Sequence, residues 1–335
     1  MIALQIKPRG KPIKKLPNSV EVDLSTTTVK ALYERIAAHT GLGYHRLRLT
    51  KGSDGSHLVA KHQDGKLIQI DEAGLRDNSV VYVKDLGPQI GWRTVFVVEY
   101  LGPLLIHPLM LYVLRPFVYS SSPLNPLSYL PFAPSFKGNL PPPSFNQVLV
   151  CWLTTLHFLK REYETLFVHR FSAATMPFRN IFKNSAHYWI LSGINLAYFL
   201  YMPAVSPTAS WWPKSLDPMQ NPNVIYAACA LWLFSEASNF HTHMTLRNLR
   251  PSDGSTKRQI PRGYGFNLVT CPNYLFESLA WFAVMILSGG HWASVLFLVV
   301  STGQMMAWAK KKEHRYRKEF GRAYKKKSSM FPGLW

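Results

Sequence analysis

Ionisable and amide side chains stand inside four apolar stretches of the sequence: VVEYLGPLLI, LHFLKREYETLFVHRF, LWLFSEASNFHTHMTL and CPNYLFESLAW. Among the polar residues in them, those that stand out as candidates are Glu99, His157, Lys160, Arg161, Glu236, Asn239, His241, His243, Asn273, Tyr274 and Glu277. A single residue of this kind would be explained by a contact between helices or by a side chain that reaches the membrane surface. Charges on four stretches are costly to bury, and they favour convergence on one polar cavity.

Spacing places several of these residues on common helical faces. One face follows the spacing i, i+4, i+8 and i+11 through Asn239, His243, Arg247 and Arg250. A second pair, Asn273 and Glu277, is spaced at i, i+4. A polar face that ends in two arginines suits a phosphate-bearing ligand, because guanidinium groups pair bidentately with phosphate oxygens. Such a ligand is expected to enter from the cytosol.

Two other kinds of chemistry lack the residues that they need. A soluble dinucleotide fold carries Gly-x-Gly-x-x-Gly after a strand, and both GLG at 41–43 and GYG at 263–265 lack the third glycine. A membrane di-iron oxygenase would need several histidine-rich boxes, whereas His241-x-His243 is one isolated pair. The three cysteines are widely spaced, without metal-ligand spacing. We therefore expect no metal.

Long apolar segments must position these side chains. Aromatic residues make up 13% of the chain and charged residues 17%, a composition that leans towards a membrane protein. A bilayer crossing needs about 20 apolar residues. Six stretches approach that length, at roughly 91–118, 147–168, 186–205, 223–245, 273–289 and 292–309. We predict an all-α, multi-pass membrane domain over residues 87–335.

The charges in the loops predict an orientation. With a cytosolic N-terminus, the loops 169–185 and 246–270 and the tail 310–335 would face the cytosol. All three segments are rich in Lys and Arg. The opposite loops, 119–146 and 206–222, hold only Lys137, Lys214 and Asp217 as charged residues. The net charge of +20 thus lies beside apolar segments. This favours membrane flanks over nucleic-acid binding.

Residues 1–86 predict a separate α+β domain. The segments IALQI and VEVDL alternate like a hairpin, and 29–40 shows helical spacing after a threonine-rich N-cap. HRLRL, KLIQI and VVYVK follow as short predicted strands. The order resembles a ubiquitin-like fold, for which an interaction or folding role is expected.

Longer motifs resemble a known family. NFHTHMTLRNLRP, IPRGYGFNLVTCPNYLFESLAW and EHRYRKEFGRAY resemble the C-terminal domain of the steroid 5α-reductase superfamily. GPQIGW, HFLKREYETLFVHRFS and TMPFRNIFKNSAHYW resemble its trans-2-enoyl-CoA reductase branch, in which a ubiquitin-like N-terminal domain is typical. The resemblance covers essentially the whole chain.

The resemblance implies an activity and a setting. It implies NADPH-dependent reduction of a trans-2-enoyl-CoA to a saturated acyl-CoA. That is the last step of the very-long-chain fatty acid elongation cycle, which feeds sphingolipid synthesis. It also implies the endoplasmic reticulum membrane with both termini cytosolic and contact with membrane lipid. Expected partners are the other elongation enzymes: the condensing enzyme, the ketoreductase and the dehydratase.

Site roles follow from the same resemblance. Tyr274 matches the proposed proton donor, and the other catalytic candidates are Glu99, Lys160 and Arg161. Residues expected around NADPH are Asn239, His243, Arg247, Arg250, Asn273, Glu277 and Tyr316. Those expected around the substrate are Gln89 and His157. A nearby cation, Lys160 or Arg161, is expected to stabilise the enolate.

Three alternatives remain beside this interpretation. A steroid 3-oxo-Δ4 reductase would use the same cofactor, although Phe158 stands where the steroid enzymes carry a tyrosine. A membrane methyltransferase of the isoprenylcysteine type has a related fold and would bind S-adenosylmethionine. A non-catalytic ubiquitin-like membrane scaffold would have no need of the cluster Asn273, Tyr274 and Glu277.

Overall fold

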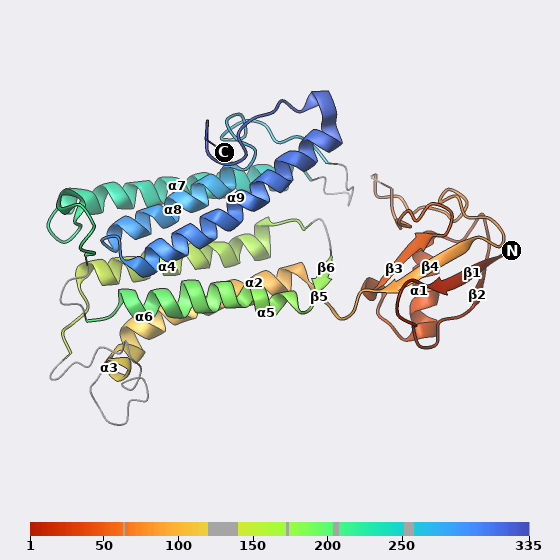
Figure 1. Ribbon diagram of the computed structural model, residues 1–335, viewed down its shortest axis with the longest axis horizontal. Helices are drawn as coiled ribbons and strands as arrows, with labels where there is room; N and C mark the ends of the chain where they lie inside the picture. The colour runs from red at the N-terminus through yellow and green to blue at the C-terminus, as the bar shows by residue number, and fades with distance from the viewer. Residues whose placement is uncertain (63, 120–139, 172–173, 204–207, 251–257, 335) are drawn as a thin grey trace. The chain divides into compact units, whose positions relative to one another are not determined.

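The computed structural model describes the chain except residues 63, 120–139, 172–173, 204–207, 251–257 and 335 (Figure 1). It forms two compact units. The first comprises Met1–Thr94, Arg170–Asn180 and Asn248–Gln259, and the second comprises Val95–His169, Ile181–Arg247 and Ile260–Trp335. Most of the predicted loop 119–146 and part of 206–222 and 246–270 lie outside the described residues.

The N-terminal part of the first unit is a mixed four-stranded sheet covered by one helix. Its elements are β1 (Ile2–Pro8), β2 (Ser19–Val22), α1 (Val29–Thr40), β3 (Leu47–Lys51) and β4 (Val80–Asp85). The strand order is β2-β1-β4-β3, with β1 parallel to β4 and both other pairs antiparallel. Thr28 caps α1 by accepting from the backbone N–H of Ala31 at 3.1 Å, and Gly41 ends the helix at φ 68°.

A hydrophobic core of its own holds this sheet and helix together. Leu4, Ile36 and Val83 are fully buried members of that core. At its edge Arg46 binds Asp85 at 2.6 Å, and this guanidinium holds the pKa of the Asp85 carboxyl below its usual range. The predicted hairpin, helix and strands around 45–49 and 80–84 are therefore confirmed as a small sheet with one helix.

The predicted strand KLIQI at 66–70 is wrong. Its residues make only isolated bridges, Lys61 with Leu67 and Thr28 with Gln69. Its backbone N–H groups instead donate single hydrogen bonds to different segments: Ile68 donates to the carbonyl of Ala60, and Ile70 donates to the carbonyl of Thr27. A strand needs a continuous partner strand, and within the described part of the chain none runs beside this apolar segment.

The second unit is a bundle of helices, and a short two-stranded sheet belongs to the first unit. The main helices are α2 (Trp92–Leu109), α4 (Phe145–Tyr163), α7 (Pro222–Asn248), α8 (Pro272–Leu287) and α9 (Trp292–Phe320). Shorter helical elements are η2 (Met110–Leu114), α3 (Arg115–Val118), η4 (Glu164–Val168), α5 (Asn180–Ser185), η5 (Ala186–Asn195), α6 (Leu196–Leu200), η6 (Lys214–Leu216) and η7 (Gly321–Ala323), whereas η1 (Tyr44–Arg46) belongs to the first unit. The strands are β5 (Gln89–Gly91) and β6 (Thr175–Pro177). Figure 1 shows α7, α8 and α9 running together in one layer.

Two helices of the described part are long and apolar enough to span a membrane: Trp92–Val118 and Trp292–Ala323. Helix α8 is apolar but shorter. Helices α4 and α7 carry several charged residues, and these lower their apolar character although both are long. Two of the six predicted spans are thus supported by length and composition.

Close helix packing inside the bundle depends on one glycine of α2. A Cβ at Gly102 would lie 2.4 Å from the indole ring of Trp189 on η5. The indole N–H donates to the Val98 carbonyl at 2.7 Å, so the ring cannot withdraw without losing that bond. Gly102 therefore sets the distance between α2 and η5.

Gly102→Ala is expected to lower the free energy of unfolding by about 1–3 kcal/mol, the usual range for overpacking. Gly303→Ala on α9 is the control, because a Cβ there has no atom within 4 Å. Thermal unfolding of the detergent-purified protein measures both variants. Equal midpoints would contradict the close approach of Trp189.

Candidate active site

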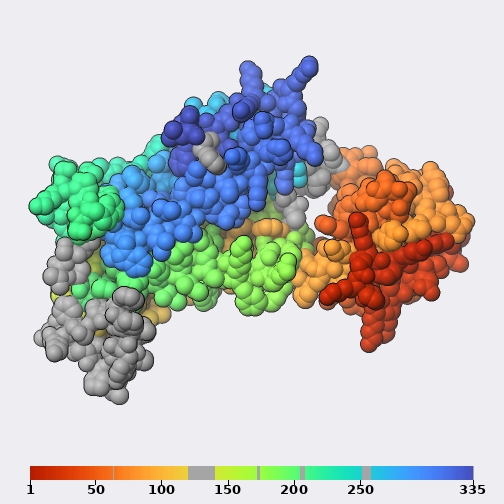
Figure 2. Space-filling model, viewed as in Figure 1, coloured from red at the N-terminus to blue at the C-terminus, as the bar shows by residue number. Residues whose placement is uncertain are grey.

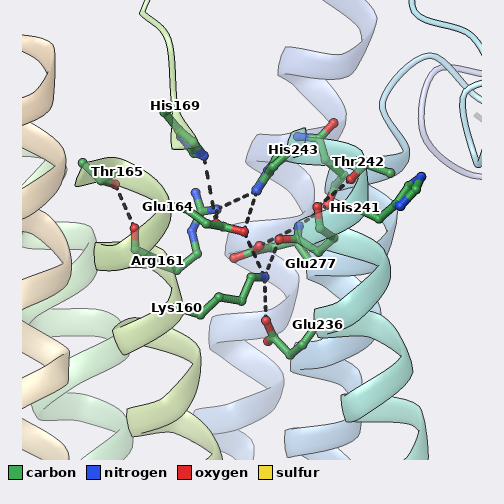
Figure 3. Close-up of polar contacts among 12 residues, drawn as sticks. Lys160, Arg161, Glu164, Thr165, His169, Glu236, His241, Thr242, His243 and Glu277 are labelled. Atoms are coloured by element: carbon green, nitrogen blue, oxygen red, sulfur yellow. Dashed lines mark hydrogen bonds and ion pairs between the residues drawn. The ribbon is translucent and has the colours of Figure 1, made fainter. Parts of the chain in front are cut away.

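The C-terminal end of α4 supplies charged side chains that meet those of neighbouring helices inside the second unit (Figure 3). The helix passes at Glu164 into the π-helical segment η4, a wide turn that often marks a functional site. Lys160 and Arg161 both reach Glu164, whose side chain is fully buried. We call the following residues the charge network: His157, Lys160, Arg161, Glu164, Glu236, Asn239, His243 and Glu277.

His157 joins two helices through carboxylates on both sides of its ring. Its Nδ1 lies 2.6 Å from Oε1 of Glu236 on α7, and its Nε2 lies 3.2 Å from Oε1 of Glu277 on α8. A ring nitrogen donates only when it carries a proton, so the imidazolium form satisfies both contacts. His157 is 3% exposed, and it is therefore a buried cation that ties α4 to α7 and α8.

Lys160 forms the second link between α4 and α7. Its Nζ donates to Oε2 of Glu236 at 2.7 Å and to Oδ1 of Asn239 at 2.6 Å. Glu164 lies 3.5 Å away on its own helix. The three contacts use the donors of one ammonium group.

Arg161 divides its guanidinium between two elements. Its Nη1 donates to Oε2 of Glu164 at 2.5 Å and lies 3.3 Å from Nδ1 of His243. Its Nη2 donates to the hydroxyl of Tyr100 on α2 at 2.9 Å. Nδ1 of His243 is also 3.0 Å from Oε1 of Glu164. Arg161 thus connects α4 with α2 and faces α7.

Asn239 closes the network towards α8. Its Nδ2 donates to the Asn273 carbonyl at 2.8 Å and to Oε2 of Glu277 at 3.1 Å. Asn239 is 1% exposed, so an unpaired amide here would be costly. Asn239 and His243 therefore lie on the face of α7 that points into the network, as their spacing predicts. Asn239 contacts both members of the i, i+4 pair on α8.

The network balances its charges. The carboxylates of Glu164, Glu236 and Glu277 face Lys160, Arg161 and the His157 imidazolium. Removing an ion from water costs several kcal/mol, and only close pairing offsets that cost. A site of this kind holds fixed donors and acceptors in surroundings that water screens little, which suits the stabilisation of charge that develops during a reaction.

Two predicted catalytic residues flank the network. Tyr274 packs beside Trp308 and lies within electrostatic range of Arg161 and Tyr100. Glu99 on α2 is 1% exposed and lies within electrostatic range of Asn184 and Arg161. Both therefore belong to the surroundings of the network without an ion pair to it among the described residues.

Other predicted residues have different surroundings. Arg247 lies one turn beyond His243 and is partly exposed, and Tyr316 on α9 is buried with its ring 5.4 Å from that of Tyr324. In the first unit, Gln89 donates to the carbonyls of Leu86 and Gly87, and its Oε1 accepts from Thr175 at 3.3 Å. Arg250, also in the first unit, donates to the carbonyl of Arg170.

Three residues have the types of a metal site. Ligand atoms of Glu164, His169 and His243 lie within 4.8 Å of one another. However, Nη1 of Arg161 already contacts both Glu164 and His243. A guanidinium that contacts two of the three groups opposes a second cation there. The residues therefore fit an arginine rather than a metal ion.

Sequence reasoning gave no role to three residues that the structure brings into the site: Tyr100, Glu164 and Glu236. Glu164 stands four residues after Lys160, the spacing of a helical ion pair, and that signal was present. Glu236 stood out only as an ion in an apolar stretch. Tyr100 had no signal, since its role depends on a contact with a residue 61 positions away.

Comparisons with known proteins relate the chain to reductases. The family described as 3-oxo-5-alpha-steroid 4-dehydrogenase matches residues 174–335. The chain is 43% identical over 332 residues to a Schizosaccharomyces pombe protein assigned by name to the enoyl reductases, with 99% of each chain covered. It is 39% identical to the very-long-chain enoyl-CoA reductase of Dictyostelium discoideum, with 90% of each covered. It is 34% identical to a Caenorhabditis elegans protein assigned to the same kind of reductase, with 91% of this chain covered.

Glu236→Gln is expected to lower the free energy of unfolding by about 3–5 kcal/mol, because His157 and Lys160 lose their shared counter-charge. Glu162→Gln on α4 is the matched control. Glu162 is also buried, at 8% exposure, and its carboxylate oxygens have no hydrogen-bond partner among the described residues. Thermal unfolding in detergent compares the two. A loss of stability as large in the control would show that any buried glutamate matters equally.

Proposed function

The chain belongs to the family of very-long-chain enoyl-CoA reductases, and from this premise we propose that it reduces a trans-2-enoyl-CoA to the saturated acyl-CoA with NADPH. Relatives that align over nine-tenths or more of the chain are named as enoyl reductases or very-long-chain enoyl-CoA reductases. The observation that carries the proposal is the buried, balanced charge network with Tyr274 beside it. The reaction is the last step of the elongation cycle, and its product feeds sphingolipid synthesis.

The residues of the chain have two tasks in a conjugate reduction. When the hydride reaches the β-carbon, the electron pair of the double bond moves to the thioester oxygen as an enolate. Fixed donors must stabilise this oxygen, and an acid must protonate the α-carbon. Tyr274 takes the role of acid in this proposal. Glu99, Lys160, Arg161 and His157 surround the acceptor and hold the charges in place.

The residues present fit the nicotinamide cofactor. Asn273 offers a buried Oδ1 with no hydrogen-bond partner among the described residues. The N–H of a carboxamide, such as that of nicotinamide, is the donor that this acceptor lacks. NADPH would supply the hydride, and the proposed set that holds it is Asn239, His243, Arg247, Arg250, Asn273, Glu277 and Tyr316. Gln89 is proposed on the substrate side.

A steroid acceptor is the nearest alternative, because the matching family is described by a steroid reaction. That match covers residues 174–335 only, whereas the enoyl reductase relatives align with the whole chain. The expected steroid-contacting tyrosine is replaced by Phe158, which is fully buried in the core of the bundle. We therefore favour the enoyl thioester.

We propose six membrane crossings in the endoplasmic reticulum membrane, and exposed apolar stripes on α2 and α4 support a lipid surrounding. On α2 the residues Leu101, Leu105 and Leu109 are exposed at one-turn spacing. On α4 the exposed stripe is Trp152, Leu156 and Leu159, on a helix whose opposite face carries the charge network. Stripes of this kind need an apolar surrounding. A bilayer requires apolar side chains on the lipid-facing surface and charged side chains in the interior of the bundle.

The N-terminal sheet and helix are proposed to be a ubiquitin-like domain over residues 1–86, with the membrane domain from 87 onward. The strand order with β1 parallel to β4 supports this. The basic residues of the tail 310–335 lie at the surface of the second unit, where Figure 2 shows the blue end of the chain. We propose cytosolic termini, contact with membrane lipid, and docking of the condensing enzyme, ketoreductase and dehydratase.

Purified protein is expected to oxidise NADPH when a trans-2-enoyl-CoA is added, and Tyr274→Phe is expected to lower turnover by about 10²–10⁴, the range for loss of a general acid. NADPH affinity should be retained, because the hydroxyl makes no hydrogen bond among the described residues. Steady-state absorbance and a fluorescence titration measure the two. Wild-type turnover in this variant would remove Tyr274 from the mechanism, and an inactive wild type would refute the function.

The topology predicts which positions a membrane-impermeant thiol reagent reaches in sealed microsomes. Gln259→Cys should react without detergent, because it lies in a basic, cytosolic loop. Ser210→Cys should react only after detergent. Each is made in a background that lacks the three native cysteines, and both positions are exposed, so access alone does not distinguish them. The reverse pattern of labelling would invert the orientation.

A further inference from the structure

Both cations that were expected to stabilise the enolate are already paired. Lys160 gives its close contacts to Glu236 and Asn239. Arg161 gives its closest contact to Glu164. Neither has an unpaired charge to offer directly to a thioester oxygen. The charge of Arg161 is nevertheless directed onward, because its other terminal nitrogen donates to the hydroxyl of Tyr100 at 2.9 Å.

The Tyr100 ring is held on several sides. It stacks on Phe96 with 5.9 Å between ring centroids and meets Tyr188 edge to face at 5.0 Å. Phe158 lies at 6.4 Å, and the guanidinium carbon of Arg161 lies 5.1 Å from the ring centre. Tyr100 is 2% exposed. Its hydroxyl is therefore fixed in position before any ligand binds.

The Tyr100 hydroxyl has an unused proton. A phenol can accept from one group and donate to another, and Arg161 fills the accepting side. Among the described residues no oxygen or nitrogen accepts the proton of Tyr100. A buried hydroxyl without an acceptor is costly, and a ligand oxygen would remove that cost. A donor that itself accepts from a cation is also strengthened by the chain of bonds.

We propose that Tyr100 donates a hydrogen bond to the thioester carbonyl oxygen of the enoyl-CoA, with Arg161 and Glu164 as its positioning residues. This inference rests on the proposed function and extends it. Tyr274 follows Asn273, whose carbonyl accepts from Asn239 of the charge network, and Arg161 of the same network donates to Tyr100, so both tyrosines adjoin the network. They divide the work: Tyr100 acts on the oxygen and Tyr274 on the α-carbon.

The electron count of the step assigns each group one task. Hydride adds to the β-carbon, the π electrons of the double bond move into the C–C bond next to the carbonyl, and the carbonyl π pair goes to oxygen. Tyr100 stabilises that oxygen and keeps its own proton throughout. The enolate returns to a thioester when its α-carbon takes a proton from Tyr274. One hydride and one proton are consumed, and Tyr274, left as a phenolate, takes its proton back from water before the next turnover.

Tyr100→Phe is expected to lower kcat by about 10²–10³, the range for loss of one oxyanion donor, with an unchanged Kd for NADPH. Tyr188→Phe is the matched control. It removes a hydroxyl from the neighbouring ring that Arg161 does not bind, and its kcat should stay within about twofold of wild type. If wild type reduces enoyl-CoA and Tyr100→Phe does so equally fast, this assignment is wrong while the proposed function stands. If wild type itself is inactive, the proposed function fails first.

A second series separates donation from packing. Ring-fluorinated tyrosines placed at position 100 keep the shape of the side chain and strengthen the hydroxyl as a donor. The value of kcat is expected to rise along the series as the hydroxyl becomes a stronger donor, while the thermal midpoint of unfolding stays constant. A purely structural role would leave kcat flat, and that result would overturn the assignment. Glu164→Gln, with Glu162→Gln as control, should lower kcat through Arg161, and an effect of equal size in both would exclude the positioning role.

Discussion

The pairing of His157 with Glu236 and Glu277 is the contact on which the rest of the bundle depends. One ring binds carboxylates of two other helices at 2.6 and 3.2 Å, and it does so at a depth where unpaired ions are not tolerated. Helices α4, α7 and α8 can therefore neither slide nor rotate past one another without stranding a charge. Lys160 and Asn239 repeat this constraint one turn away. The positions of Arg161 and Tyr100 follow from it.

This constraint also explains why the helices look less apolar than membrane helices usually do. The charges belong to the inner faces of α4 and α7, while residues such as Leu156 and Leu233 are exposed on the outer faces. An average over a whole helix mixes the two faces and approaches neutrality. The division between the faces, rather than the average, fits a bilayer around the bundle. The same division concentrates reactive groups where lipid and water are both excluded.

The extent to which the fold and site were predictable follows from the range of the forces involved. The β1–β2 hairpin, α1 and the face of α7 through Asn239 and His243 depend on spacing within one segment, and spacing is written in the sequence. Apolar alternation at 66–70 predicts a strand, but alternation does not encode whether a partner strand is present. The amide nitrogen of Gln89 donates to carbonyls of its own segment, which no sequence pattern reveals, and its place on the substrate side stays a proposal. Tyr100 gains its role only through Arg161, which no local pattern encodes.

The wide turn at Glu164–Val168 has a consequence for how this chain can change over evolutionary time. A π turn accommodates one residue more than an α turn, so deleting a residue there restores ordinary geometry without breaking the backbone. Because the wide turn has already absorbed the extra residue, side chains on both sides of the deletion would keep nearly the directions that they have now. His157, Lys160 and Arg161 before the turn would therefore stay aligned with His169 after it. A related chain could thus lose a residue at this turn without losing the charged interior of the bundle.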